Sequence, residues 1–336
     1  MCVPAYFFPD FNQLTPHHTM IKDEILKLAG LNHCPMAFAS VLAGTACAIY
    51  VDGFNFFMAS LLLLFAVILQ IGANLWNIYT DLRQGYGERI DKGVSMRECE
   101  IPLVDIVKEV AIACFVIACM IGLGIVAMTS PWLIIAGVLT AVATYLYNRL
   151  PCPLSGTIYS IIFPFLFLGV VGVYCSYYIQ AYNQWNSFEE VVSRGWAAAI
   201  SGIVIGFLAA NAQLLSYYIH TSSDLRNSKP TISTRLGKKI VRRLFMILGI
   251  AFYLVCILLI MFFPVSNISR LVVLILPTLS FLWNCLIWKK MHGAGRAELR
   301  KLLNWAIWNP LVYSLLALLL LGIALAKGYG ITMPMK

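Results

Sequence analysis

Residues 70–81, QIGANLWNIYTD, carry a polar side chain on every helical turn of an otherwise apolar run. The polar positions are Gln70, Asn74, Asn77 and Asp81. At about 100° per residue, this spacing keeps all four side chains within roughly 60° of one helix face. A second apolar run repeats the spacing with Gln213, Tyr217, His220 and Asp224. Polar groups inside a bilayer are costly and normally face a bundle interior or a wet cavity, so the two stripes predict one shared site.

The surrounding composition is that of an integral membrane protein. Of the 336 residues, 60% are hydrophobic and 12% are charged, whereas charged residues make up about a quarter of a soluble domain. Apolar runs long enough to approach the width of a bilayer recur along the whole chain. They cover residues 35–51, 55–78, 103–128, 131–148, 157–178, 196–219, 243–263, 269–288 and 308–326. Because lipid offers no water to backbone polar groups, these runs predict an all-α polytopic fold with nine transmembrane helices.

Outside these runs, the sequence predicts two shorter helices. The chain divides into an N-terminal segment, residues 1–34, and a membrane domain, residues 35–336. In the N-terminal segment, residues 19–29 place their apolar side chains on one face, which predicts a helix lying at the membrane interface. Between the fifth and sixth runs, residues 187–190 have the spacing of a capping box and predict a short helix that ends near Trp196.

Basic residues collect on one side of the predicted membrane domain. Twenty of the 24 Lys and Arg residues lie in the N-terminal segment or follow the second, fourth, sixth and eighth runs. The positive-inside rule therefore predicts a multi-pass protein of the cell membrane whose N-terminus and both terminal aspartates face the cytoplasm. The net charge of +9 follows from this topology. Anionic lipid or a phosphorylated substrate is a nearer partner for these residues than nucleic acid.

Each stripe ends in an aspartate that opens a basic loop. Mg²⁺ prefers oxygen ligands, commonly one or two carboxylates together with phosphate oxygens of a substrate, so Asp81 and Asp224 are candidate ligands. Asn77 lies one turn before Asp81 and can add an amide oxygen. The basic residues expected to balance phosphate charge are Arg83, Arg89, Arg226 and Lys229. Stabilising a leaving diphosphate in this way lowers the barrier to an allylic carbocation, and an apolar bundle interior suits an isoprenoid tail.

At these residues the chain resembles the UbiA-type intramembrane prenyltransferase superfamily. Residues 77–81, NIYTD, match the N-x-x-x-D motif that follows the second span, and residues 224–237 are similar to the family segment that follows the last aspartate of its D-x-x-x-D motif. Further positions are most similar to the 1,4-dihydroxy-2-naphthoate polyprenyltransferases of menaquinone synthesis. These positions are Asn74-Leu75-Trp76-Asn77, Tyr79, Gly85, Pro153-Leu154 and Tyr177-Tyr178-Ile179-Gln180. The resemblance implies nine helices around a central cavity, Mg²⁺ as cofactor, and a polyprenyl diphosphate and an aromatic acceptor as substrates.

Three positions depart from that resemblance. Ile78, Gly87 and His220 stand where the family usually has aspartate. Glu88 and Asp91 are nearby loop carboxylates that are expected to replace one of the lost metal ligands. A neutral imidazole is a poor ligand for Mg²⁺. His220 is therefore expected to donate a hydrogen bond to phosphate or to act as a base toward an aromatic hydroxyl, with a purely structural histidine as the alternative.

The sequence thus predicts Mg²⁺-dependent transfer of a polyprenyl group, with Asp81, Asp224 and His220 as catalytic residues. The expected binding residues for acceptor and prenyl chain are Gln70, Asn74, Gln213 and Tyr217. The same amides also suit hydrogen bonds that bridge helices in lipid. Two alternatives stay open, an intramembrane terpene cyclase and a non-catalytic relative that binds an isoprenoid or a quinone. Secondary transport is disfavoured because no corresponding pair of spans is broken by Gly or Pro.

Overall fold

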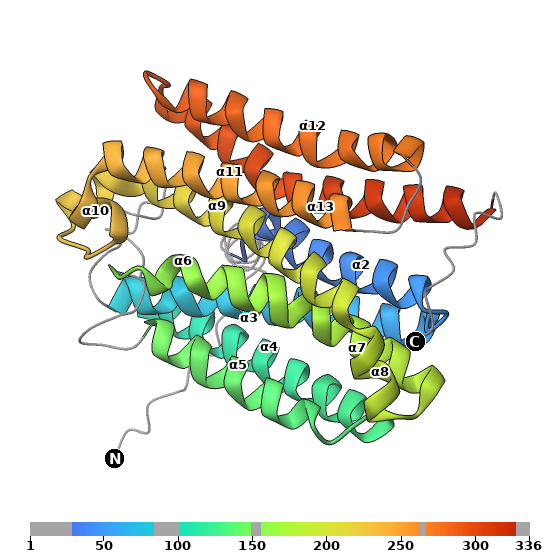
Figure 1. The fold of residues 1–336 in the computed structure, drawn as a ribbon. Helices are drawn as coiled ribbons and strands as arrows, with labels where there is room; N and C mark the ends of the chain where they lie inside the picture. The colour runs from blue at the N-terminus through green and yellow to red at the C-terminus, as the bar shows by residue number, and fades with distance from the viewer. Residues whose placement is uncertain (1–28, 84–100, 149–155, 263–266, 327–336) are drawn as a thin grey trace, which may run out of the picture.

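A computed structural model describes residues 29–83, 101–148, 156–262 and 267–326, and every regular element in those ranges is helical (Figure 1). The first elements are η1 (Leu31–His33), α2 (Cys34–Tyr50), α3 (Phe56–Arg83), α4 (Ile101–Met128) and α5 (Leu133–Asn148). A composite helix follows, built from α6 (Tyr159–Pro164), a π-helical segment η4 (Phe165–Val171) and α7 (Gly172–Trp185). The remaining elements are α8 (Phe188–Arg194), α9 (Trp196–Arg226), α10 (Ile232–Leu236), α11 (Lys238–Phe262), α12 (Asn267–Met291) and α13 (Arg296–Ala326).

The helices agree closely with the apolar runs of the sequence. Each run coincides with a helix or, for the fifth run, with the composite α6–η4–α7 helix. In the described part of the chain, seven helices are long and apolar enough to cross a membrane, while α5 supplies a shorter apolar stretch, Leu133–Thr144. An all-helical multi-pass membrane protein is therefore established, and the count of nine spans stays a prediction.

The two short helices predicted from the sequence have different outcomes. Helix α8 is present, and its N-cap residue Ser187 accepts a hydrogen bond from the backbone N–H of Glu190, as the capping pattern predicted. Glu190 also pairs with Arg194 one turn later, at 3.0 Å. The predicted interfacial helix at residues 19–29 lies almost wholly outside the described residues.

Helices α2 and α9 occupy the centre of the bundle (Figure 1). About two thirds of the membrane-crossing window of each is buried, compared with 17% for α4. Helix α2 packs against α3, α7, α9 and α13, and α9 packs against η4, α11 and α13. Helices α3, α4 and α5 lie on one side of this central pair, and α11, α12 and α13 lie on the other.

Glycines let α9 approach the composite helix closely. Gly202 and Gly206 are one turn apart on α9, and they face Gly169 in the π-helical segment. A Cβ atom on Gly169 would lie 2.6 Å from the carbonyl oxygen of Gly202, and one on Gly206 would lie 2.6 Å from the carbonyl oxygen of Phe165. Small residues at such crossings allow backbone contact between helices in lipid. The sequence analysis did not single out this pair.

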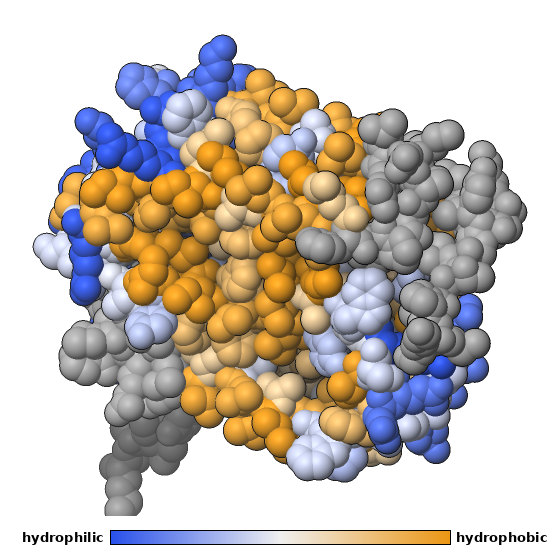
Figure 2. Space-filling view, viewed as in Figure 1, coloured by the Kyte–Doolittle hydropathy of each residue, from blue (hydrophilic) through white to orange (hydrophobic). Residues whose placement is uncertain are grey.

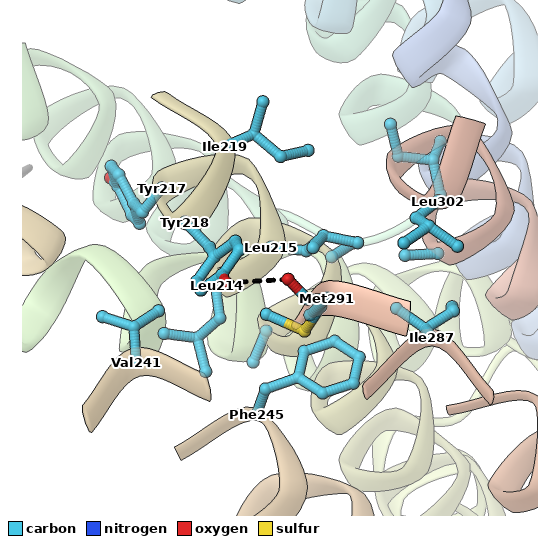
Figure 3. Close-up of a cluster of buried hydrophobic side chains, with 14 of the residues drawn as sticks. Leu214, Leu215, Tyr217, Tyr218, Ile219, Val241, Phe245, Ile287, Met291 and Leu302 are labelled. Carbon is cyan, nitrogen blue, oxygen red and sulfur yellow. Dashed lines mark hydrogen bonds between the residues drawn. The ribbon is translucent and has the colours of Figure 1, made fainter. Parts of the chain in front are cut away.

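Buried side chains tie α9 to the C-terminal helices near its basic end. Figure 3 shows Leu215 and Tyr218 of α9 packed with Phe245 of α11 and with Ile287 and Met291 of α12. The Tyr218 hydroxyl donates a hydrogen bond to the Met291 carbonyl oxygen, at 2.8 Å. On the outer surface, apolar residues form a broad band between two hydrophilic ends (Figure 2), as expected for a protein that spans a bilayer.

Candidate active site

The two aspartate-ended segments meet through an ion pair. The Lys229 ammonium, in the loop after α9, donates to the carboxylate of Asp81 near the end of α3. Their side chains are 7% and 18% exposed, so the pair is largely withdrawn from water. The sequence stripes predicted one shared site, and this contact joins the corresponding ends of the two helices. Lys229 was predicted to bind diphosphate, and here it neutralises a predicted metal ligand.

The loop that presents Lys229 is held by its own backbone. Ser228 has a left-handed conformation with φ of 53°, which turns the chain back toward α9. The Lys229 N–H then donates to the carbonyl oxygen of Asp224, at 2.8 Å. Thr231 and Thr234 then form a capping box that starts α10, and the Thr234 hydroxyl donates to the Lys229 carbonyl oxygen, at 3.2 Å. These bonds fix the lysine backbone on both sides. The Lys229 side chain is thereby aimed from a rigid turn rather than from a free loop.

Asp224 lies at the base of the same turn. The residue has no solvent exposure. A carboxylate withdrawn from water is very costly unless positive charge lies close to it. Asp224 accepts the backbone N–H of Lys229 at its main-chain oxygen, while the Asp81 carboxylate pairs with the Lys229 side chain, so one lysine connects the two aspartate-ended segments.

Asn77 supplies a further oxygen on the α3 side. Its Oδ1 atom is buried and accepts no hydrogen bond from any described residue. It lies one helical turn before Asp81, on the same face. Two carboxylates and an unused amide oxygen are hard donors of the kind Mg²⁺ prefers, so the residues present fit that ion. Within the described ranges, no group of three or more His, Cys, Asp or Glu side chains comes together.

Two predicted arginines lie at the edge of this region, and three other predicted site residues cannot be placed. Arg83 is exposed, and its guanidinium donates to the Tyr79 hydroxyl, at 3.1 Å, one turn back along α3. Arg226 is exposed at the end of α9. The predicted residues outside the described ranges are Glu88, Arg89 and Asp91. Their roles as metal and diphosphate ligands stay predictions.

The inner part of the α3 stripe makes hydrogen bonds that hold the start of α2. Gln70 donates to the side-chain oxygen of Asn74, at 3.1 Å. Asn74 in turn donates to the carbonyl oxygens of Ala29 and Gly30, at 3.1 and 3.3 Å. Gly30 has a left-handed φ of 63°, and a Cβ there would lie 2.9 Å from the Asn74 amide nitrogen. These bonds favour the bridging alternative for Gln70 and Asn74, and acceptor binding by them stays a prediction.

The four stripe residues of α9 are buried or half-buried. Tyr217 is 1% exposed and belongs to the buried cluster of Figure 3. His220 and Gln213 are half-buried, and the Ser223 hydroxyl donates to the His220 carbonyl oxygen, at 3.0 Å. The predicted roles of these stripe residues toward acceptor, prenyl chain or phosphate stay predictions.

One residue near the site was missed by the sequence analysis. Asn227 follows Asp224 by three residues in the same turn, and its Nδ2 atom is buried without a hydrogen-bond acceptor among the described residues. An amide donor beside Lys229 suits a phosphate oxygen. Its place directly after α9, inside the aspartate-to-glycine segment of residues 224–237, was the available signal.

A helical bundle of membrane-crossing length, whose two aspartate-ended helices are joined at one end by Lys229, fits the class of intramembrane prenyltransferases. The sequence matches the UbiA prenyltransferase family over residues 37–308, and the chain belongs to that family. It is therefore a prenyltransferase, as the sequence motifs predicted.

Characterised relatives are similar over about two thirds of the chain. The 1,4-dihydroxy-2-naphthoate octaprenyltransferase of Mycobacterium leprae is 25% identical over 217 residues, which is 65% of this chain and 70% of the relative. The enzyme of the same name from Escherichia coli is 29% identical over 219 residues, 62% of this chain and 67% of the relative.

Solved structures share the fold at lower identity. A UbiA homologue from Archaeoglobus fulgidus, described as bound to GPP and Mg²⁺, is 14% identical with a TM-score of 0.57, covering 88% of this chain and 99% of that chain. A digeranylgeranylglyceryl phosphate synthase is 13% identical with a TM-score of 0.53, covering 89% of this chain and 99% of that chain. These likenesses support the bundle architecture.

Proposed function

We propose that the protein transfers a polyprenyl group from a polyprenyl diphosphate to an aromatic acceptor in quinone biosynthesis, with Mg²⁺ as cofactor. The acceptor that the relatives favour is 1,4-dihydroxy-2-naphthoate, since two relatives are named for it. The observation that carries the proposal is the ion pair of Lys229 with Asp81, which joins the ends of α3 and α9 at one end of an apolar bundle. The proposal includes nine spans around a central cavity and a site that faces the cytoplasm.

The residues divide into oxygen donors and positive groups. Asp81, Asp224 and Asn77 would hold Mg²⁺, which when bound supplies positive charge that stabilises the leaving diphosphate. Lys229 neutralises Asp81 in the structure without substrate. On substrate binding, its ammonium is placed to turn from this carboxylate to a diphosphate oxygen, and Asn227 can donate to another. Arg83 and Arg226 add positive charge at the rim.

The reaction then proceeds by substitution at the allylic carbon. The bond between this carbon and the diphosphate oxygen breaks, and the electron pair leaves with diphosphate. The electron-rich ring of the acceptor forms the new carbon–carbon bond, and with dihydroxynaphthoate the attacked position loses carbon dioxide. An apolar interior keeps water from quenching the cation. His220 is proposed to donate to phosphate or to accept a proton from an acceptor hydroxyl.

The test is turnover by purified protein with labelled polyprenyl diphosphate, Mg²⁺ and acceptor. Asp81→Asn is expected to abolish most of the product. Asp52→Asn is the matched control, because Asp52 is an exposed carboxylate beyond the opposite end of α3, and its left-handed φ of 56° also suits asparagine. Undiminished turnover by Asp81→Asn would exclude the metal role. Release of diphosphate without any acceptor, with a cyclised hydrocarbon as product, would instead support a terpene cyclase.

A further inference from the structure

A cavity of about 430 Å³ lies between the end of α12 and the start of α13. It is lined by Lys290, Ala297, Glu298, Lys301, Leu302 and Trp305. All of these residues except Leu302 are exposed. Because α12 and α13 lie on the opposite side of the central helices from α3, this cavity is separate from the candidate active site (Figure 1).

The cavity carries excess positive charge. Lys290 and Lys301 contribute two ammonium groups, and Glu298 contributes one carboxylate. Among the described residues, neither lysine forms an ion pair. The Lys290 ammonium lies 5.3 Å from the ring centroid of Trp305, within the range of a cation–π contact. Both charges are thus available to an anion that enters from outside the bundle.

An aromatic layer lies directly beside these charges. The rings of Trp283 and Trp305 have centroids 5.4 Å apart, and the Trp283 indole N–H donates to the Trp305 carbonyl oxygen, at 3.2 Å. Both residues are about two fifths exposed. Tryptophan is enriched at the level of lipid head groups because its ring is apolar and its N–H is polar. The pair therefore marks the membrane interface on this face.

Farther along the same helices the exposed side chains become apolar. On α12 the exposed residues Leu282 and Leu279 lie beyond Trp283, and on α13 the exposed residues Trp308, Val312 and Leu315 lie beyond Trp305. The order along the surface is ammonium, indole and then aliphatic side chain. A phospholipid has the matching order of phosphate, glycerol backbone and acyl chains.

We propose that this cavity binds the head group of an anionic phospholipid, with its phosphate between Lys290 and Lys301 and its chains along α12 and α13. The positive charge selects the anionic head group, the indole pair sets its depth, and the exposed apolar side chains of α12 and α13 hold the acyl chains. A soluble phosphate ion would need neither the indole pair nor the apolar side chains of α12 and α13.

The experiment measures binding of phosphatidylglycerol and of phosphatidylcholine to the purified full chain by native mass spectrometry. The double variant Lys290→Gln/Lys301→Gln is expected to lose phosphatidylglycerol affinity by roughly 10- to 30-fold. Lys239→Gln/Arg243→Gln is the matched control, because it removes the same charge from two exposed residues of α11 at the same end of the bundle. Glu298→Gln is expected to strengthen binding, since it removes the only acidic side chain of the lining.

Equal losses in the double variant and its control would overturn the proposal, because general attraction to a basic surface would then explain the binding. Equal affinity for phosphatidylcholine would overturn it as well. Displacement of phosphatidylglycerol by inorganic phosphate at matched concentration would show a site for free anions instead of a lipid. Loss of affinity confined to Lys290→Gln/Lys301→Gln, with phosphate inert, supports the proposal.

Discussion

Helix α9 carries buried polar residues on two opposite faces, and the two faces are used differently. Asn211 and Gln213 are two residues apart, so at about 100° per residue they point in nearly opposite directions. The Gln213 face ends at Asp224 and the turn that carries Lys229, where opposite charges meet. The Asn211 face packs toward α11 and α12, where the uncharged residues Asn211 and Asn284 lie near Gly249. Burial of a polar group is therefore a poor guide to function unless charges converge with it.

The Asn211 face has polar atoms without hydrogen bonds in the described part of the chain. Both amide atoms of Asn211, which is 1% exposed, and the amide nitrogen of Asn284 are buried without a partner there. Gly249 lies between them, since a Cβ on it would be 3.7 Å from the Asn211 nitrogen and 3.8 Å from Asn284. Such groups cost stability in a bundle interior. At the charged end, by comparison, Lys229 pairs with Asp81 across helices.

The comparison predicts its largest effect at Asp224. Asp224→Asn keeps the shape of the buried side chain but removes its charge, so transfer is expected to fall roughly 100- to 1,000-fold while the protein stays folded. Steady-state product formation and the melting temperature, measured together, separate the two effects. Full activity in this variant would place the site elsewhere in the bundle.

A smaller effect is expected at Lys229. Lys229→Gln removes the ammonium that pairs with the mostly buried Asp81 carboxylate, which should destabilise the protein by about 2 kcal/mol. The KM for prenyl diphosphate should also rise about tenfold, because one charge-assisted hydrogen bond to phosphate is lost. The stability loss should shrink in the double variant Lys229→Gln/Asp81→Asn, where no uncompensated charge remains. Additive losses would mean that the two side chains do not interact in solution.

A substitution on the Asn211 face should raise the stability of the protein instead of lowering it. Asn211→Leu is similar in volume and removes two unbonded polar atoms, so a gain of about 1 kcal/mol in stability with unchanged turnover is expected. Thermal unfolding in detergent and the transfer assay provide the readouts. If the variant instead lost both stability and activity, Asn211 would belong to a functional polar site. The proposed difference between the two faces of α9 would then be wrong.

The smallest effect concerns Gly249. A methyl group fits there with no contact shorter than 3.7 Å, and alanine is preferred over glycine inside a helix by about 0.5–1 kcal/mol. Gly249→Ala should therefore raise the melting temperature slightly. Gly206→Ala is the matched comparison, because its Cβ would lie 2.6 Å from the Phe165 carbonyl oxygen and should destabilise the bundle. A lower melting temperature for Gly249→Ala would indicate that the space that the methyl group fills is occupied by a hydrogen-bond partner of Asn211.

Much of the fold follows from local properties of the chain. Hydropathy predicted all the long helices, because each apolar run coincides with one of them. The capping pattern at Ser187 predicted α8. Both signals depend on residues within a few turns of each other. The shared stripe spacing also predicted that the segments ending in Asp81 and Asp224 would meet, and the ion pair of Lys229 with Asp81 brings their ends together.

The different contacts of the individual stripe residues could not be predicted from the sequence. Gln70 and Asn74 share the spacing of Asp81, yet Gln70 donates to the Asn74 side chain and Asn74 donates to the backbone before α2. Asn227 lies in the segment of residues 224–237, but only the structure shows that its amide nitrogen is buried without an acceptor among the described residues. Such assignments require knowing which neighbour each side chain meets.

By itself the sequence determined the long helices, the membrane character and the family, because a bilayer imposes length, hydropathy and periodicity residue by residue. Only the tertiary structure decided that α2 and α9 form the centre, that Lys229 neutralises Asp81, and that Asn211 packs toward α11 and α12. The physical reason is distance along the chain. Lys229 and Asp81 are 148 residues apart, and contacts of that range follow from how whole helices pack, with glycines setting how closely they approach.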